Sequence, residues 1–396
     1  MKSFAHYLFL LLISLNASSQ IIIRNYHDKE KKILKEEFET TFTGSDTVKN
    51  GGYKIFYLNG NLWQQGNFKD NVLVGKWIDN HPNGELKQDL FFKNGLLHGK
   101  IISYYANGKT QQINHYNNDI LEGTVKIYHE NGNLMEETTY LHNLPHGLSK
   151  GYYENGKLRY STSMIKGLEN GLSESYYDNG VIQERATKKN GRFEGKFIGY
   201  HKNHPDTIQK ICFYTNGILH GKFQGFYGSG NIMNECEYLN DKIEGDYLEF
   251  FDNSNMEVYA SGNYDGNIKT GKWTTFYPNG EIHVQGNYSD DKRNGEWTVY
   301  HYNKTIKQIG SYQLGKESGL YKFYSNDGVL QHTGEYVEGH KNGDWKFFYT
   351  SGKLKVHNIY IMGARYGIAI AYNEKGEVIE KAEYQNNVKI KELPLK

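Results

Sequence analysis

The chain has 396 residues, a length at which two or three ordinary domains would be expected. Its composition argues against such domains, because only 37% of the residues are apolar while 15% are aromatic, with 34 Tyr and 44 Gly. This combination predicts thin β-structure held by aromatic contacts rather than a thick helical core. Lys and Arg (46) balance Asp and Glu (45), so no broad basic field exists and no nucleic-acid partner is expected.

The first nineteen residues have the pattern of a secretory signal peptide. Lys2 precedes an apolar run from Tyr7 to Leu15, and Ala17-Ser18-Ser19 resemble a cleavage site before Gln20. The run is too short for a comfortable transmembrane helix, although an N-terminal anchor is the main alternative. We therefore expect a signal peptide at residues 1–19 and an exported protein. Periplasmic, cell-envelope and extracellular locations all stay open.

A register of glycines divides the chain into about fourteen repeats. Eleven of the thirteen intervals between them are 24 residues long, and the other two are 26. We count positions in each repeat from its register glycine. The register glycines are Gly51, Gly75, Gly99, Gly123, Gly147, Gly171, Gly195, Gly221, Gly245, Gly271, Gly295, Gly319, Gly343 and Gly367.

Each repeat has the signature of a β-hairpin. Position +5 is aromatic in thirteen repeats, position +11 is usually Leu, Ile or Val, and position +17 is usually Tyr or Phe. Positions +8 and +9 are Asn-Gly in seven repeats, which favours a type I′ turn with positive φ at both residues. We therefore predict strands at about +2 to +7 and +10 to +17, with the remaining residues, such as 289–294, as a connection.

The two long repeats agree with this placement of the hairpin tip. Both lack Asn-Gly and have four-residue segments there, at 203–206 and 253–256. Downstream residues return to register if two extra residues lie at the tip, which is where insertions are tolerated.

The predicted turn pairs position +6 with +11 and position +2 with +15. Trp273 would then lie opposite Gly286, Trp297 opposite Gly310, and Tyr321 opposite Gly334. An aromatic ring that covers a cross-strand glycine stabilises such a gap, so this side is expected to be the better-packed face.

A single hairpin is marginal in water, so each repeat must gain stability from its neighbours. The sequence predicts an all-β fold, an elongated single-layer antiparallel sheet of about fourteen stacked β-hairpin repeats at residues 51–390. A cap or linker is expected at 20–50 and a tail at 391–396. Residues 28–38, as a short helix or an extra strand, and residues 385–396 are expected to cover the two edges.

The repeats resemble a known family. The segments 288–300 (YSDDKRNGEWTVY) and 336–352 (YVEGHKNGDWKFFYTSG) resemble MORN repeats, and more specifically the bacterial MORN-repeat variant found in YwqK-family antitoxins. The resemblance covers roughly residues 51–390. It implies a single-layer sheet of hairpins and a role in protein or membrane association, and it supplies no catalytic residues. The predicted signal peptide argues against a cytoplasmic antitoxin.

The aromatic +5 side chains are the candidate binding residues. They are expected on the face opposite the Trp–Gly pairs, bordered by polar residues at +12 and +14. Such a stripe can hold an extended peptide or stack on sugar rings, and it can equally be structural packing of ring on ring. The candidates are Tyr104, Tyr128, Tyr152, Tyr176, Tyr200, Phe226, Phe250, Phe276, Tyr300, Tyr324, Phe348 and Tyr372.

Cysteines and histidines give no second site. Cys212 and Cys236 occupy equivalent positions of adjacent repeats, so one strand should separate them by about 9.6 Å. A disulfide needs Cα atoms within about 7 Å, and we expect none. His98, His146 and His220 each precede a register glycine, which is typical of repeat decoration rather than of a converging metal site.

The leading functional hypothesis is a secreted, non-catalytic scaffold that binds a protein or peptide along its Tyr-rich face. The alternative is a carbohydrate-binding cell-envelope protein that uses the same stripe. Peripheral lipid binding and an antitoxin-like inhibitor are less favoured. The sequence contains no P-loop, no G-x-S-x-G elbow and no H-E-x-x-H helix, so neither an enzyme nor a cofactor is expected.

Overall fold

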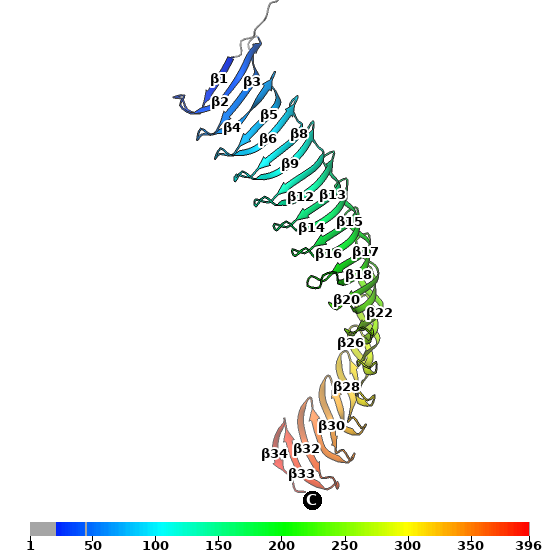
Figure 1. The fold of residues 1–396 in the computed structure, drawn as a ribbon. Coiled ribbons are helices and arrows are strands. Elements are labelled where there is room, and N and C mark those ends of the chain that lie inside the picture. The colour runs from blue at the N-terminus through cyan, green and yellow to red at the C-terminus, as the bar shows by residue number, and fades with distance from the viewer. Residues whose placement is uncertain (1–20, 44–45, 396) are drawn as a thin grey trace, which may run out of the picture. The chain divides into compact units, whose positions relative to one another are not determined.

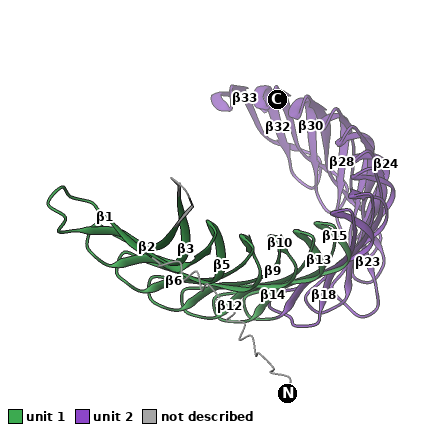
Figure 2. Ribbon diagram, turned by 90° about the horizontal axis from the view of Figure 1, so that it is seen from above, with its two compact units in different colours: residues 1–180 green, residues 181–396 purple. Residues whose placement is uncertain are grey.

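The computed structural model describes residues 21–43 and 46–395, so the predicted signal peptide lies outside the described residues. The chain divides into two compact units, residues 1–180 and residues 181–396 (Figure 2). The described residues form strands and turns without a helix, and the strand pairings within each unit are antiparallel (Figure 1). The predicted fold class, an all-β array of antiparallel hairpins in a single layer, is confirmed.

The strands of the first unit are β1 (Ile21–Tyr26), β2 (Leu34–Thr43), β3 (Asp46–Phe56), β4 (Leu62–Lys69), β5 (Val72–Asn80), β6 (Leu86–Lys93), β7 (Leu96–Leu97), β8 (Gly99–Tyr104), β9 (Thr110–Asn117), β10 (Ile120–Leu121), β11 (Gly123–Tyr128), β12 (Leu134–Leu141), β13 (Leu144–Tyr152), β14 (Leu158–Ile165) and β15 (Leu168–Tyr176). Strands β1 and β2 pair with each other within the segment expected as a cap or linker, and β2 also pairs with β3, which continues into the first repeat.

The strands of the second unit are β16 (Ile182–Lys189), β17 (Arg192–Tyr200), β18 (Ile208–Thr215), β19 (Ile218–Leu219), β20 (Gly221–Phe226), β21 (Ile232–Leu239), β22 (Lys242–Phe250), β23 (Val258–Asp265), β24 (Ile268–Phe276), β25 (Ile282–Ser289), β26 (Lys292–Tyr300), β27 (Ile306–Gln313), β28 (Lys316–Tyr324), β29 (Leu330–Val337), β30 (His340–Phe348), β31 (Leu354–Ile361), β32 (Ala364–Tyr372), β33 (Val378–Gln385) and β34 (Val388–Glu392). The last strand, β34, pairs with β33.

The predicted strand boundaries were displaced from the observed ones. The first strand of a repeat runs from three residues before the register glycine to position +5, as in β26, and the second runs from +11 to +18, as in β27. The predicted connection 289–294 was wrong, because it contains the end of β25, a two-residue turn and the start of β26. The register glycine therefore lies inside a strand.

The predicted type I′ turn at Asn-Gly was also wrong. At the tip after β24, Gly280 donates to the carbonyl of Tyr277, and only Gly280 has positive φ (81°). A four-residue turn whose last residue alone is left-handed is the type I turn with a glycine bulge. Asn279 keeps negative φ, so asparagine is present there for another reason.

The type I′ pattern occurs at the opposite end of the hairpins. Asp290 and Asp291, between β25 and β26, have φ of 51° and 60°. The corresponding residues Asp70 and Asn71, between β4 and β5, have φ of 50° and 65°. Two-residue turns with positive φ at both positions match strand twist, so each "connection" is itself a tight hairpin turn.

The register glycine is required by its backbone. All fourteen have positive φ, for example 71° at Gly295, and they lie where the pairing register shifts. Residues with a Cβ rarely adopt this conformation within a strand, whereas glycine does so freely. The glycine period of the sequence thus records a bulge in every repeat.

Two other sequence predictions are confirmed in the second unit. Position +2 pairs with +15, so Trp273 lies opposite Gly286. The insertions lie at hairpin tips, because β17 ends at Tyr200 and β18 begins only at Ile208. The predicted +6 to +11 pair is wrong: Phe276, at +5, pairs with Ile282 after a one-residue shift.

Candidate binding face

The large rings at positions +2 and +17 pack on one side of the sheet, which we call the ring face. Trp297 lies edge-on between Tyr288 and Tyr312, with ring centroids 5.2 and 6.1 Å away. The indole N–H donates to the carbonyl of Asn287 at 3.1 Å, and the side chain is only 5% exposed. Edge-to-face packing with a satisfied N–H is a structural arrangement.

The tryptophans at +2, and Tyr321, each cover a glycine of the preceding hairpin, not the residue that pairs with them. A Cβ on Gly286 would overlap the indole of Trp297, although Gly286 pairs with Trp273. The predicted covering of a glycine by its own cross-strand partner is therefore corrected. Because the contact joins successive repeats, it holds hairpin to hairpin.

Lysine and arginine side chains lie over the indole rings on the ring face. Lys269 lies 4.2 Å from the centroid of Trp273, Arg293 lies 4.4 Å from that of Trp297, and Lys341 lies 4.3 Å from that of Trp345. A cation over an aromatic face is attracted by the ring quadrupole. The indole rings are thus occupied on both sides within the fold.

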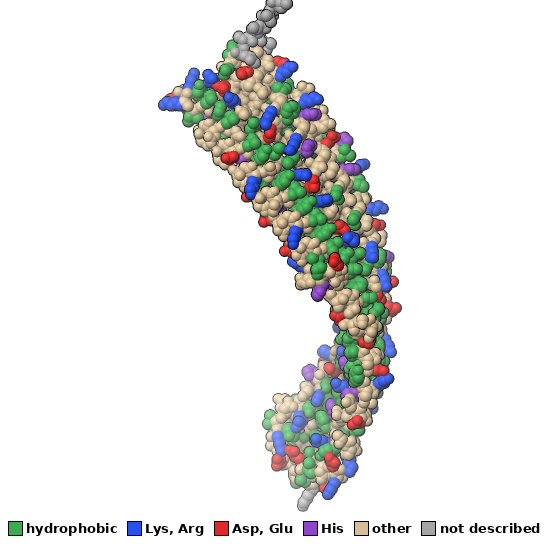
Figure 3. Space-filling model, in the orientation of Figure 1, with side chains coloured by type: hydrophobic (Ala, Val, Ile, Leu, Met, Phe, Trp, Pro, Cys, Tyr) green, Lys and Arg blue, Asp and Glu red, His purple; other side chains and the backbone are tan. Residues whose placement is uncertain are grey.

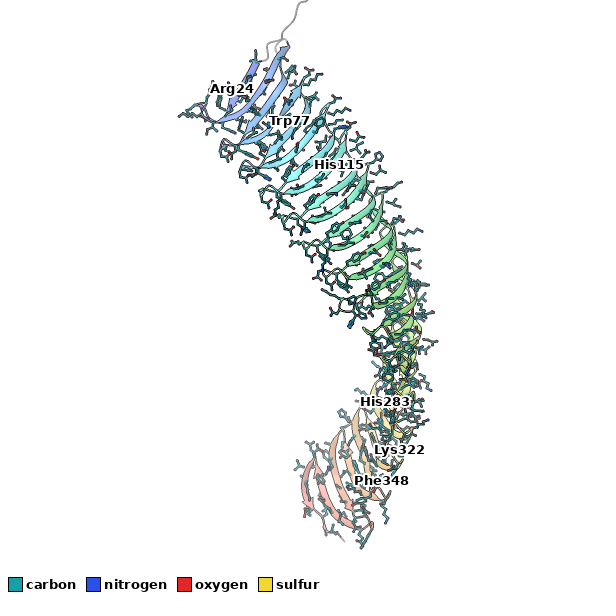
Figure 4. The ribbon with its side chains drawn as sticks, in the orientation of Figure 1. Arg24, Trp77, His115, His283, Lys322 and Phe348 are labelled. Atoms are coloured by element: carbon teal, nitrogen blue, oxygen red, sulfur yellow. The ribbon has the colours of Figure 1, made fainter. Side chains whose placement is uncertain are left out.

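The face opposite the ring face carries the +5 side chains, and we call it the tyrosine face. Each of the twelve candidate residues is the last residue of its strand, from Tyr104 in β8 to Tyr372 in β32; Figure 4 labels Phe348 in this position at the end of β30. The hydroxyl of Tyr300 accepts a hydrogen bond from Gln285, at +14, so these two positions share a face. The candidates are half-buried, except Phe250, which is 5% exposed.

Position +12 does not border the +5 stripe as expected. His283, at +12 and labelled in Figure 4, packs against Tyr277 with ring centroids 4.4 Å apart. It lines the same hollow as Trp273 and Trp297. Because the strand bulges between +11 and +13, the +12 side chain turns to the ring face. Burial, and to a smaller extent Lys307, lowers the pKa of His283.

Sequence reasoning missed the residue at +6, which anchors the +5 stripe. The Tyr105 hydroxyl donates to the carbonyl of Tyr128 at 2.6 Å, and Tyr277 donates to that of Tyr300 at 2.9 Å. His301 makes the equivalent contact with the carbonyl of Tyr324 at 3.0 Å. Position +6 is Tyr or His in eleven repeats, a regularity visible in the sequence.

The tip asparagine also bonds between repeats. Asn131 donates from Nδ2 to the carbonyl of Glu154 at 3.0 Å, and its Oδ1 accepts from the backbone N–H of Asn133. The same lateral bond joins Asn155 to the carbonyl of Asp178. This ladder explains asparagine at +8 where positive φ does not.

The tyrosine face of the first unit carries a group of exposed aliphatic side chains, which we call the leucine patch. Each is between 45% and 52% exposed. Its members lie on β12–β15, and they are Leu141, Leu144, Leu148, Ile165, Leu168 and Leu172. Figure 3 shows apolar side chains with lysines and acids among them on the visible side of this unit.

Pairing places the patch on the same face as the +5 stripe. Leu141 pairs with Leu144, and Ile165 pairs with Leu168. Leu148 pairs with residue 163, two positions before Ile165, so these side chains point the same way. The first two pairs both join the end of one strand to the start of the next. In the following repeat the equivalent pair is charged, Lys189 with Arg192, which shows that the patch is local.

Paired charges border the patch. Lys126 forms an ion pair with Glu137 at 3.2 Å, and this hydrogen bond raises the pKa of the lysine. Burial, and then the Glu137 carboxylate, raises the pKa of Tyr152. The phenol is therefore neutral at physiological pH and can both donate and accept hydrogen bonds.

The other candidate groups show no reactive arrangement. Cys212 and Cys236 are free and buried, and β20 lies between their strands β18 and β21. Burial raises the pKa of Cys236 to about 11, which disfavours the thiolate. In residues 21–43 and 46–395, no group of three or more His, Cys, Asp or Glu side chains could hold a metal ion. In the same residues, no helix is long and apolar enough to cross a membrane.

Stacked hairpins, lateral ladders at the hairpin tips and one packed ring face define a single-layer β-hairpin repeat scaffold. The sequence matches the MORN repeat variant family at residues 49–70, 73–94, 97–118, 121–142, 145–166, 169–190, 219–240, 269–290, 293–314 and 341–361. These segments cover more than half of the chain. The chain belongs to this family.

Similarity to individual proteins is low. No curated protein matches the chain. Two solved structures, "Crystal Structure of TcdB2-TccC3-Cdc42" and "Crystal Structure of TcdB2-TccC3 without hypervariable C-terminal region", are each 10% identical with a TM-score of 0.13. Their alignments cover 94% and 92% of this chain but only 26% and 23% of the matched chains.

Proposed function

We propose that this chain is a non-catalytic scaffold that binds a protein or peptide partner on the tyrosine face of its first unit, centred on the leucine patch. The observation that carries the proposal is the six exposed aliphatic side chains gathered over β12–β15. Contiguous exposed apolar surface on a folded protein is typical of an interaction site.

The neighbouring aromatic stripe supports this location. Tyr128 and Tyr152 end β11 and β13 on the same face as the patch. Their carbonyls accept hydrogen bonds from Tyr105 and His129 of the preceding repeats, at 2.6 and 3.4 Å. A fixed backbone presents the half-buried phenols with little loss of conformational entropy on binding, and tyrosine is favoured in protein interfaces.

The ring face is the weaker candidate for the same role. Its largest rings are almost fully buried, as at Trp345 (0% exposed), and their N–H groups are already bonded within the fold. A partner on that side would meet lysines, arginines and the edges of rings rather than open apolar surface.

The test replaces Leu148 and Leu172 together with glutamate. Both side chains are exposed, so folding should be unaffected, while two desolvated charges should weaken binding at least tenfold. The matched control changes Leu320 and Ile368, the equivalent +1 residues of two repeats in the second unit, to glutamate. Cross-linking in the native cell envelope followed by mass spectrometry reads out the partner.

The proposal requires one protein captured by the wild type and the control and lost by the patch variant. Equal capture by all three would contradict it. A glycan array distinguishes the carbohydrate alternative: sugar binding that survives the leucine changes and is lost when Tyr128 and Tyr152 become alanine would favour that alternative.

We also infer export, on the basis of the apolar run at residues 7–15 and the small residues that follow. Cell fractionation tests it, because deletion of residues 1–19 should retain the protein in the cytoplasm. Unchanged export after that deletion would contradict the inference.

A further inference from the structure

The last complete repeat departs from the packing rule of the ring face. In its neighbours a large ring at +2 covers a glycine of the preceding hairpin, as Trp345 covers Gly334. At the next step the ring is replaced by Ala369 and the glycine by Asn358. The pairing around them is unchanged, because His357 pairs with Ile370 just as Thr333 pairs with Lys346 one repeat earlier.

Loss of the ring leaves a hollow of about 350 Å³ on the ring face of the second unit. Ala369 forms part of its lining at the position where indole rings stand in neighbouring repeats. Its lining includes Phe347, Val356, Asn358, Arg365, Ala369 and Glu380. A hollow of this size accommodates a small organic molecule or one residue of a peptide.

One residue of the lining, Asn358, has a buried amide oxygen without a partner. Asn358 is 5% exposed, and its Oδ1 atom has no hydrogen bond. A buried acceptor without a donor costs about 1–3 kcal/mol, so such atoms in folded proteins usually have a bound donor. The site therefore calls for an N–H or O–H group.

A guanidinium group lies at the same hollow without a carboxylate partner. Arg365 stacks on the ring of Tyr384, 4.5 Å from its centroid, and forms no ion pair with the described residues. Glu380, which also lines the hollow, already forms an ion pair with Lys389 at 3.0 Å. The arginine fork is therefore free to receive a planar anion.

We propose that this hollow binds an α-carboxylate with an adjacent N–H, the group at the C-terminus of a peptide or in an amino acid. The carboxylate bonds to Arg365, the N–H donates to Asn358 Oδ1, and the side chain lies against Val356, Phe347 and Ala369. Phosphate fits less well for two reasons. Its oxygens are mainly acceptors, whereas Asn358 Oδ1 needs a donor, and it has no apolar group to pack against Ala369.

Titration calorimetry of the full chain tests the proposal with three probes: N-acetyl-L-leucine, L-leucine and N-acetyl-L-leucinamide. At least one of the two carboxylates should bind, and the amide should bind at least tenfold more weakly. Tighter binding of N-acetyl-L-leucine assigns a peptide C-terminus, whereas tighter binding of L-leucine assigns a free amino acid. If neither carboxylate binds, or if the amide binds as well, the proposal is overturned.

Matched variants place the binding in the hollow. Arg365→Gln should weaken carboxylate binding at least tenfold, while Lys341→Gln, at the equivalent position over Trp345, should leave it unchanged. The double change Asn358→Gly with Ala369→Trp restores the ring and glycine of other repeats, so it should abolish binding. Binding that persists in both Arg365→Gln and the double variant would place the ligand elsewhere.

Asn358→Leu separates recognition from folding. The leucine keeps the branched heavy-atom skeleton of the asparagine, has the hollow beside it for its larger methyl groups, and removes the unpartnered oxygen. The denaturant midpoint should therefore not fall, while binding should weaken about tenfold. A variant that is as stable as the wild type and binds as tightly would remove Asn358 from the site and contradict the proposal.

Discussion

At the scale of single residues, glycine has two unrelated functions in each repeat. Gly295 is needed for its backbone, because its φ of 71° lies in the left-handed region. Gly286 has no such φ and is needed for space, since the indole of Trp297 occupies the position that a Cβ would take. The sequence shows the period of both, but only the fold distinguishes conformational need from packing need.

Gly286→Ala should therefore destabilise the protein through packing alone. The new methyl must displace an indole that is buried between two tyrosines, which costs about 1–3 kcal/mol. Denaturant unfolding followed by tryptophan fluorescence measures the change. The control is Gly52→Ala, where a Cβ would meet only the flexible Glu39 side chain at 3.6 Å and stability should change by less than about 1 kcal/mol. Equal effects at the two glycines would rule out the role of the ring.

At the scale of the element, the hairpin was predictable but its ends were exchanged. Asn-Gly is a strong type I′ signal, and the tips carry it, yet Asn279 has negative φ and only Gly280 is left-handed. The true type I′ turns are at pairs such as Asp290-Asp291. Aspartate and asparagine tolerate positive φ, but in a sequence they indicate such a turn less strongly than glycine does. Local sequence could not separate the two ends, because tip asparagines such as Asn131 and Asn155 form a lateral bond to the next repeat, which does not require positive φ.

The candidate stripe shows the same limit. Its twelve positions could be found from period alone, and all end equivalent strands. The leucine patch could not be found, because strands that begin before the register glycine bring Leu141 and Leu144 together, and this offset depends on the turn that was misassigned. The contact of Trp297 with Gly286 of the preceding hairpin could not be predicted either, because no residue near Trp297 in the sequence indicates which glycine the ring covers.

Asp291 offers a test of the corrected turns. Its φ is 60°, and its carboxylate accepts the backbone N–H of Lys269 at 2.7 Å. Asp291→Asn keeps both features and should be nearly neutral. Asp291→Gly keeps the conformation and loses the bond, costing about 1 kcal/mol, and Asp291→Ala loses both, costing about 2–3 kcal/mol.

The reference for this series is Asn279→Ala at the tip, where φ is negative and one backbone bond at 3.2 Å is lost. It should cost less than Asp291→Ala. Thermal or urea unfolding gives the order. If alanine were tolerated better at residue 291 than at residue 279, the assignment of the left-handed turn would be incorrect.

At the scale of the whole molecule, stability comes from aromatic side chains spread over the described strands rather than from one central core. Tyr53 and Tyr214 illustrate this: each packs against rings of adjoining strands, and burial, as the largest cause, raises the pKa of each to about 12. Burial likewise raises the pKa of Tyr247 to about 12 and that of Cys236 to about 11. Uncharged phenols and thiols are thus part of the folded state throughout the chain.

This distribution predicts a loss of stability in alkali. In the unfolded chain these tyrosines lose their protons near pH 10.0 and the cysteine near pH 9.0, whereas in the folded chain they hold them to about pH 12 and 11. Above pH 9 the unfolded state therefore binds fewer protons than the folded state, so the free energy of unfolding falls as pH rises. The stabilisation should be complete below pH 9 and lost progressively up to about pH 12, and urea midpoints across this range measure it.

Tyr247→Phe should reduce the slope of the urea midpoint against pH, because one titrating phenol is removed while its ring remains against Trp273. A midpoint that is constant or rises between pH 9 and pH 12 would show that the buried phenols do not contribute as argued.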